Sequence, residues 1–224
     1  MDNGKTYEVI QQFDKIARLP DYWDHNQQYQ SYLLSQIDGS KEYGLDIGCG
    51  TGELTGMLKK YCMHVVGIDI SPIMIQEAKI RNSKNGIEFI KCDIEEFLST
   101  TKKTFDVVIS IATFHHLDIE TTLRSIKSKL NKNGLLLILD IYKQQTFYEQ
   151  ILSMTATICN PIMSLFKRHS LFPTEEERKL WKDHFKYDTY NTIREIREIA
   201  EKTLGQISIK RHLFWRYTLI YRNE

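Results

Sequence analysis

The chain has 224 residues, of which 42% are apolar and 26% are charged, and its formal net charge at pH 7 is +1. This length suits a single domain with one sizeable core, and the near-zero charge excludes a bulk electrostatic attraction to nucleic acid or to an anionic membrane. The four cysteines form no C-x-x-C pair, the first residues are polar, and no apolar run approaches the roughly 18 residues of a membrane span, so we expect reduced thiols in a cytoplasmic protein without stable membrane association.

Residues 1–40 are expected to form an N-terminal helical cap of two helices broken at Leu19-Pro20-Asp21. Five short apolar runs then predict strands, at 43–47, 64–69, 87–91, 105–110 and 135–141. Between the strands, apolar residues with helical spacing predict helices at 53–61 and 119–130, and Ser71-Pro72 has the sequence of an N-cap followed by a first helical residue. Such alternation of strands and helices is typical of an α/β fold with a parallel sheet and helices on both faces.

A long insertion at 143–190 follows the fifth strand, and its first part, 143–170, is amphipathic. We expect this part to be a lid over the acceptor or a face that forms a dimer. Two capping boxes, Thr174 with Glu177 and Thr192 with Glu195, predict helix starts, and two strands near 207–212 and 216–221 close the chain. The whole of 1–224 is then one domain, with a core at 41–142, a helical lid at 143–190, and a closing helix and strand pair at 191–224.

The most informative segment is the glycine loop that follows the first strand. Glycines at 48, 50 and 52 stand between the strand and the helix that starts near Glu53. Glycine permits positive φ and lets backbone groups touch a ligand, and the helix N-terminus that follows offers free N–H groups. The spacing does not fit the dinucleotide fingerprint G-x-G-x-x-G, because its third glycine would fall on Glu53.

Two acidic residues follow the next two strands. Asp69 ends the second strand and Asp93 follows the third, so parallel strands would bring both carboxylates to the same edge of the sheet as the glycine loop. A carboxylate in the position of Asp69 can accept hydrogen bonds from both hydroxyls of a ribose, and Asp93 can accept one from an adenine amino group.

These residues resemble the motifs of class I S-adenosylmethionine (SAM)-dependent methyltransferases. Asp46-x-Gly48-x-Gly50-x-Gly52 is similar to the first motif of that family, and Gly67-Ile68-Asp69-Ile70-Ser71 to the next. The resemblance implies a Rossmann-like fold with a mostly parallel seven-stranded sheet, an antiparallel last strand, helices on both faces and a helical cap. It implies SAM as methyl donor, with Gly48 and Gly50 at its methionine end, Asp69 at the ribose, and Asp93 with Ile94 at the adenine. The expected cofactor-binding residues are Asp46, Gly48, Cys49, Gly50, Gly52, Asp69, Ile70, Met74, Asp93, Ile94, Ser110 and Trp23.

The N-terminal Phe13-Asp14-Lys15-Ile16-Ala17, together with Trp23-Asp24-His25-Asn26, resembles a segment that many small methyltransferases fold over the bound cofactor. Trp23 fits this interpretation and fits a core aromatic residue equally well.

Candidate catalytic residues follow the fourth strand, in Ser110-Ile111-Ala112-Thr113-Phe114-His115-His116. Histidine titrates near neutral pH, so His115 is a candidate general base, with His116 as a second candidate. The alternative is that His115 only shapes the pocket and His116 packs behind it. Adjacent residues rarely reach the same ion, so no metal site is expected.

The sequence favours a methyltransferase that modifies an O or N atom of a small metabolite, as a monomer or homodimer. Two alternatives remain. One is a tRNA or RNA methyltransferase, for which basic residues near the C-terminus would form the footprint, and the other is a SAM-binding protein without turnover. The basic residues concerned are Lys210, Arg211, Arg216 and Arg222.

Overall fold

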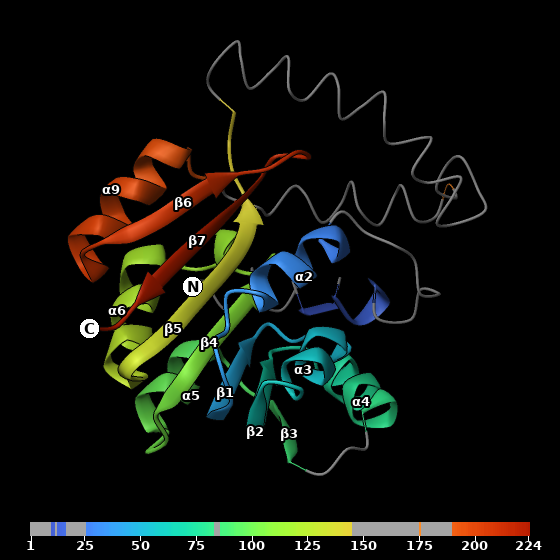
Figure 1. The fold of residues 1–224 in the computed structure, drawn as a ribbon. Coiled ribbons are helices and arrows are strands. Elements are labelled where there is room, and N and C mark those ends of the chain that lie inside the picture. The colour runs from blue at the N-terminus through green and yellow to red at the C-terminus, as the bar shows by residue number, and fades with distance from the viewer. Residues whose placement is uncertain (1–9, 12, 17–25, 83–85, 145–174, 176–189) are drawn as a thin grey trace.

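The computed structural model describes residues 10–11, 13–16, 26–82, 86–144, 175 and 190–224. At its centre is one seven-stranded sheet in the order β3-β2-β1-β4-β5-β7-β6 (Figure 1). Strands β1 to β5 run parallel, whereas β7 pairs antiparallel with both β5 and β6. The strands are β1 Lys41–Ile47, β2 Cys62–Asp69, β3 Ile87–Lys91, β4 Phe105–Ile111, β5 Leu130–Ile141, β6 Ile207–Arg211 and β7 Arg216–Arg222. The predicted fold class is therefore confirmed.

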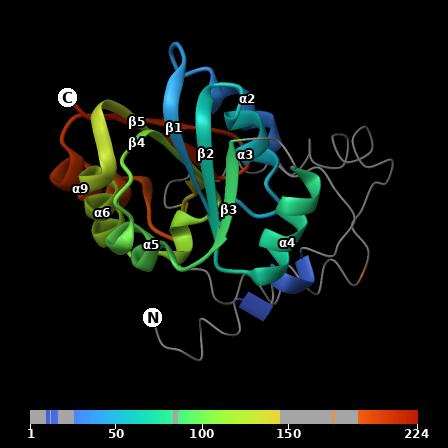
Figure 2. The same ribbon diagram turned by 90° about the horizontal axis from the view of Figure 1, so that it is seen from below.

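Helices cover both faces of the sheet (Figure 2). They are α2 Gln27–Leu34, α3 Glu53–Leu58, α4 Pro72–Arg81, α5 Ile94–Thr100, α6 Ile119–Lys129 and α9 Ile193–Leu204, with a 3-10 helix η1 at Phe114–His116. Alternate residues of the central strands enter two apolar clusters. In β4, Val108 packs with the side chains of α5, α6 and α9, whereas Val107 packs with those of α2 and α3. Burial on both faces explains why these strands contain runs of consecutive apolar residues, such as 107–109 in β4 and 135–139 in β5.

The strand order reverses between β1 and β4, since β1 leads out to β2 and β3 on one side while β4 leads to β5 on the other. Connections that leave neighbouring strands in opposite directions open a crevice at the carboxyl end of the sheet, where ligands of open α/β folds bind. The glycine loop leaves β1 at this crevice, and the Ser110–His116 segment leaves β4 there. The fold thus places the two predicted functional segments side by side.

Predicted helix caps agree with the structure where it describes them. Ser71 caps α4 by accepting a hydrogen bond from the Met74 N–H, and Pro72 is the first residue of that helix. Thr192 and Glu195 form the predicted capping box of α9. The Thr174 box and nearly all of the 143–170 segment lie outside the described residues. In the ranges that are described, none of the helices is long and apolar enough to cross a membrane.

Two elements differ from the sequence prediction. Helix α5 was not predicted, and it starts where the Asp93 carboxylate accepts hydrogen bonds from the Glu95 and Glu96 N–H groups, at 2.8 and 3.3 Å. Strand β5 begins at Leu130, not at 135, because Leu130 pairs with Phe105 across a register shift. The intervening Asn133 takes a positive φ of 62° in a segment that sequence alone reads as a turn.

The capping box of α9 yields the first prediction. Thr192→Ala removes the hydroxyl that accepts the Glu195 N–H at 3.2 Å, and so leaves a helix-end donor without its partner. We expect a loss of about 1 kcal/mol in the free energy of unfolding, measured by urea denaturation. The control is Arg194→Ala in the same helix, whose side chain is 85% exposed beside Glu198, and which should cost less than about 0.5 kcal/mol. Equal losses in the two variants would contradict a specific capping role.

Candidate functional site

The glycine loop turns sharply at the end of β1. Gly48, Gly50 and Gly52 have φ values of 70°, 52° and 81°, which residues other than glycine rarely adopt. At Gly48 there is no room for a side chain either, since a Cβ atom would lie 2.1 Å from Thr113 Oγ1 in the segment that leaves β4. The loop therefore needs glycine both for its backbone conformation and for its contact with the neighbouring strand exit.

Asp69 holds this loop in place. Its Oδ2 accepts a hydrogen bond from the Gly50 N–H at 3.0 Å, and its Oδ1 accepts one from the Ser71 N–H at 2.8 Å. Burial raises the pKa of the Asp69 carboxyl, the two backbone hydrogen bonds oppose that change, and the negative charge of Asp14 adds to it. Each carboxylate oxygen keeps a second lone pair for a ligand hydroxyl. The acid predicted at the end of β2 thus lies where the sequence placed it.

Asp46 lies beneath the loop and is fully buried. The Thr55 hydroxyl in α3 donates to Asp46 Oδ2 at 2.6 Å. The other oxygen, Oδ1, is buried and has no hydrogen-bond partner among the residues that the structure describes. Burial, together with the charge of Asp69, raises the pKa of Asp46 to about 7. A buried carboxylate oxygen without a donor is costly, so this position suits a ligand that brings a cation or a donor.

The other predicted cofactor residues fall into two groups. Met74 and Cys49 border the loop: the Met74 sulfur lies 3.9 Å from where a Cβ at Gly50 would be, and the Cys49 side chain is buried. Burial raises the pKa of the Cys49 thiol, which makes it a poor nucleophile. Asp93 and Ile94 also serve the fold, because Asp93 caps α5 and Ile94 packs in the core. Ile70 is half-buried after β2, and Trp23 lies outside the described residues.

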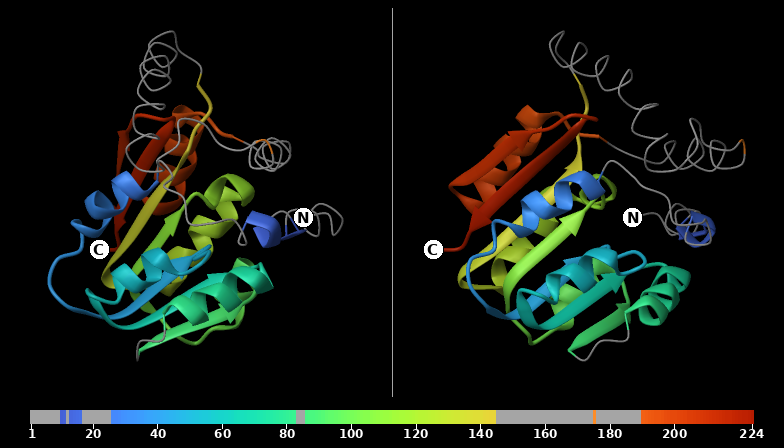
Figure 3. Two further views of the ribbon diagram at one scale, coloured as in Figure 1. Left: turned by 90° about the vertical axis from the view of Figure 1, so that its right-hand side faces the viewer. Right: turned by 45° about the vertical axis from the view of Figure 1, so that its right-hand side comes forward.

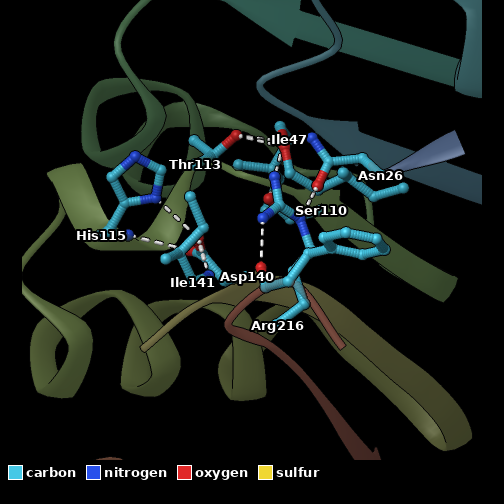
Figure 4. Close-up of polar contacts among 10 residues, drawn as sticks. Asn26, Ile47, Ser110, Thr113, His115, Asp140, Ile141 and Arg216 are labelled. Carbon is cyan, nitrogen blue, oxygen red and sulfur yellow. Dashed lines mark hydrogen bonds and ion pairs between the residues drawn. The ribbon is translucent and has the colours of Figure 1, made fainter. Parts of the chain in front are cut away.

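Ser110 joins the two central strands at the crevice. Its hydroxyl is fully buried and donates to the Ile47 carbonyl at 2.8 Å (Figure 4). Thr113 approaches the same carbonyl at 3.4 Å. The residue predicted to bind the cofactor therefore uses its hydroxyl to hold the ends of β1 and β4 together.

His115 is held by a carboxylate that the sequence analysis did not single out. Asp140 Oδ1 lies 2.6 Å from His115 Nδ1, and Asp140 Oδ2 accepts the His115 backbone N–H at 2.9 Å (Figure 4). Both residues are buried. The carboxylate favours a proton on Nδ1 and leaves Nε2 as the basic nitrogen. The signal was present in the sequence, since Asp140 is a charged residue at the carboxyl end of an apolar strand, as Asp69 is.

Aromatic rings surround the two histidines. The His115 ring lies 4.0 Å from the His116 ring and 5.5 Å from the Tyr190 ring, centroid to centroid. The His116 and Phe13 rings in turn meet edge to face, with their centroids 5.6 Å apart. Asp14 of the same N-terminal turn reaches the side of the crevice that holds the glycine loop and Asp69, where Ser71 Oγ donates to Asp14 Oδ1 at 2.5 Å. His116 thus packs beside His115, as one of the two sequence interpretations expected.

The basic residues near the C-terminus do not form one exposed patch. Arg216 is buried, and its guanidinium donates to Asn26 Oδ1 at 2.7 Å and to the Phe214 carbonyl at 2.6 Å (Figure 4). Lys210 lies over the ring of Tyr32, and Arg222 lies 3.5 Å from the Asp38 carboxylate. Including Arg216 in an RNA footprint was therefore wrong, because its charge faces the protein interior.

Comparison with known proteins agrees with this geometry. Residues 45–138, which contain the glycine loop, Asp69, Asp93 and His115, match the family model described as a methyltransferase domain. This stretch of the chain is therefore similar to a methyltransferase domain. It is 36% identical over 155 residues to the malonyl-[acyl-carrier protein] O-methyltransferase of Halalkalibacterium halodurans, which covers 63% of this chain and 57% of that protein.

A second relative is the mitochondrial ubiquinone biosynthesis O-methyltransferase of Homo sapiens, 36% identical over 110 residues, or 46% of this chain and 30% of that protein. The chain thus spans 57% and 30% of the lengths of these two relatives. Among solved structures, N-methyltransferase NodS from Bradyrhizobium japonicum, in complex with S-adenosyl-L-homocysteine, superposes with a TM-score of 0.66 at 18% identity, covering 96% of this chain and 98% of that one. That likeness shows the shared fold.

The raised pKa of Asp46 predicts how stability depends on pH. Between the ordinary aspartate pKa of 3.8 and the raised pKa of about 7, the folded protein keeps a proton that the unfolded chain releases, so the free energy of unfolding falls as pH rises through this window. We expect Asp46→Asn to remove up to about 3 kcal/mol of that decrease between pH 5 and pH 8, measured by urea denaturation.

The titration of His212 does not disturb this comparison. Burial lowers the pKa of His212 to about 4, which gives a slope of the opposite sign in the wild type and the variant alike, so it cancels in their difference. If both proteins lose the same stability between the two pH values, Asp46 is ionised in the folded protein and the interpretation fails.

Proposed function

We propose that this protein is a SAM-dependent methyltransferase that methylates an O or N atom of a small molecule. The observation that carries the proposal is the buried Asp46 carboxylate, with one oxygen lacking a partner in the described chain, beneath a glycine loop tied to Asp69. The methionine part of SAM ends in an ammonium group, which suits that oxygen. The loop and the start of α3 offer backbone N–H groups for the carboxylate at the same end of the cofactor.

The remaining cofactor contacts in this proposal are made by two acidic residues at the carboxyl edge of the sheet. In this proposal, Asp69 accepts hydrogen bonds from the ribose hydroxyls with the lone pairs that the Gly50 and Ser71 amides do not use. Asp93 uses Oδ1 to cap α5, and its carboxylate has further acceptor capacity for the adenine amino group. When bound, SAM would supply a methyl group on a sulfonium, whose carbon an acceptor O or N atom can attack in line while the C–S bond breaks and S-adenosylhomocysteine leaves.

Catalysis by this chain then consists of positioning and of proton removal. Holding the reactants in line and excluding water contributes on the order of 7–11 kcal/mol in well-oriented reactions. His115 Nε2 takes the proton that an O–H or N–H acceptor loses as its new bond to carbon forms. Asp140 positions the imidazole through Nδ1 and stabilises the imidazolium that results. Asp140 is therefore a positioning residue in this scheme.

Two observations favour a small acceptor, one on the relatives and one on this chain. The matched relatives include O-methyltransferases named for malonyl-[acyl-carrier protein] and for ubiquinone biosynthesis. The buried Arg216 and the ion pair of Arg222 with Asp38 weaken the RNA alternative.

A turnover assay tests the alternative of a SAM-binding protein without activity. The protein is incubated with SAM and metabolite extracts. Production of S-adenosylhomocysteine, together with an acceptor that gains the mass of one methyl group, would exclude that alternative. The one-domain organisation with a lid at 143–190 is part of the same proposal.

The cofactor assignment predicts the effect of Asp69→Ala. Hydrogen bonds to a charged acceptor contribute roughly 1.5–3 kcal/mol each. Losing two should therefore raise the dissociation constant of S-adenosylhomocysteine (SAH) at least about a hundredfold. Calorimetry with SAH and NAD measures this, and we expect no binding of NAD. The matched control is Asp38→Ala, an exposed carboxylate beside Lys41 at the start of β1, which should leave the affinity unchanged. Unaltered SAH affinity in Asp69→Ala would remove Asp69 from the site.

The catalytic assignment predicts the effects of His115→Ala and Asp140→Asn. Loss of a general base typically costs about 10²–10⁴-fold in rate, so His115→Ala should lower turnover by that order while the SAH affinity changes little. Asp140→Asn should also lower turnover, because an amide in that position no longer fixes the protonated nitrogen. His64→Ala, an exposed histidine stacked on Tyr43, is the control. Near-normal turnover in both site variants would show that His115 only lines the pocket.

A further inference from the structure

The N-terminal turn of residues 13–16 contacts both halves of the crevice. It is helical, and it lies at the same end of the sheet as α4 (Figure 3, dark blue). Asp14 accepts a hydrogen bond from Ser71, which follows β2, while the Phe13 ring meets that of His116, which follows β4, edge to face. Since β1 lies between β2 and β4 in the sheet, the turn crosses the end of β1, where the glycine loop leaves.

On the cofactor side, Asp14 belongs to a continuous chain of hydrogen bonds. Asp14 accepts from the Ser71 hydroxyl, the Ser71 N–H donates to Asp69, and Asp69 accepts from the Gly50 N–H. The charge of Asp14 also raises the pKa of Asp69. A ligand that hydrogen-bonds to Asp69 therefore alters the surroundings of Asp14 through Ser71, which contacts both carboxylates.

On the acceptor side, Phe13 belongs to a continuous row of ring contacts. The Phe13 and His116 rings meet edge to face, the His116 ring lies 4.0 Å from that of His115, and His115 is fixed at its other side by Asp140. Edge-to-face contacts of this kind favour one ring orientation over others. Displacing Phe13 would remove one ring that packs against His116 and, through His116, loosen the packing on one side of His115.

We propose that Phe13 is a positioning residue for the His115–His116 pair, and that Asp14 couples its position to occupancy of the cofactor site. Cofactor bound at Asp69 fixes Asp14, the adjacent Phe13 is fixed with it, and the histidines on the acceptor side become ordered. The proton-accepting group is thus fully positioned only when the methyl donor is in place. The inference rests on the proposed function, because it takes Asp69 as a cofactor-binding residue.

The test uses the full chain labelled with ¹⁵N at histidine, and SAH as the probe. The imidazole signals of His115 and His116, assigned with His116→Gln, are recorded at one pH with and without saturating SAH, and SAH affinity is measured by calorimetry. We expect SAH to shift the His116 signals in the wild type. Phe13→Ala and Asp14→Ala should each lose most of this shift, while SAH still binds to Phe13→Ala within about twofold of the wild-type affinity.

Two further variants separate positioning from general disruption. Phe13→Tyr keeps the ring edge and should restore the shift. Lys15→Ala changes an exposed residue of the same turn and should behave as the wild type. If SAH does not bind to the wild type, the proposed function fails, and the coupling fails with it. If SAH binds but Phe13→Ala keeps the full His116 shift, the coupling alone is overturned.

Discussion

The structure of the crevice depends on the carboxylate of Asp69. One side chain at the end of β2 accepts two backbone N–H groups, from Gly50 in the loop after β1 and from Ser71 at the start of α4. Both hydrogen bonds are partly buried and have a charged acceptor, so the loss of either would be costly. They fix the backbone of the glycine loop together with the Gly48 and Cys49 N–H groups, which both donate to the Ile68 carbonyl. The same carboxylate is the group that we assign to the cofactor ribose, so the loop geometry and the proposed ligand contact share one residue.

The chemistry of the site follows from the parallel arrangement of the strands. Parallel strands deliver whatever follows each of them to one edge, and here that edge collects Asp69 from β2, Asp93 from β3, His115 after β4 and Asp140 from β5. The carboxylates near the glycine loop suit the cationic and hydroxyl groups of a cofactor. The pair of His115 and Asp140 lies on the other side of the strand reversal and suits proton removal from an acceptor. One topological rule thus separates a donor side from an acceptor side.

Much of this was predictable from the sequence because the signals were local. Glycine spacing, the Ser71-Pro72 and Thr192–Glu195 caps, and the acids after apolar strands each depend on a few neighbouring residues. What the sequence did not reveal depended on distant partners. The contact of Asp140 with His115 joins β5 to the exit of β4, and the burial of Arg216 depends on Asn26 from the N-terminal part of the chain. Asp93 was read only as a ligand residue, although an Asp before Ile-Glu-Glu is also a helix N-cap.

A crystal structure of this protein with SAH tests the central claim most directly. The account predicts the ribose hydroxyls within hydrogen-bond distance of both Asp69 oxygens, with the amino group of the homocysteine part near Asp46 Oδ1. The sulfur should then face the crevice beside His115. Density for SAH away from the glycine loop, or a ribose held by residues other than Asp69, would contradict the account.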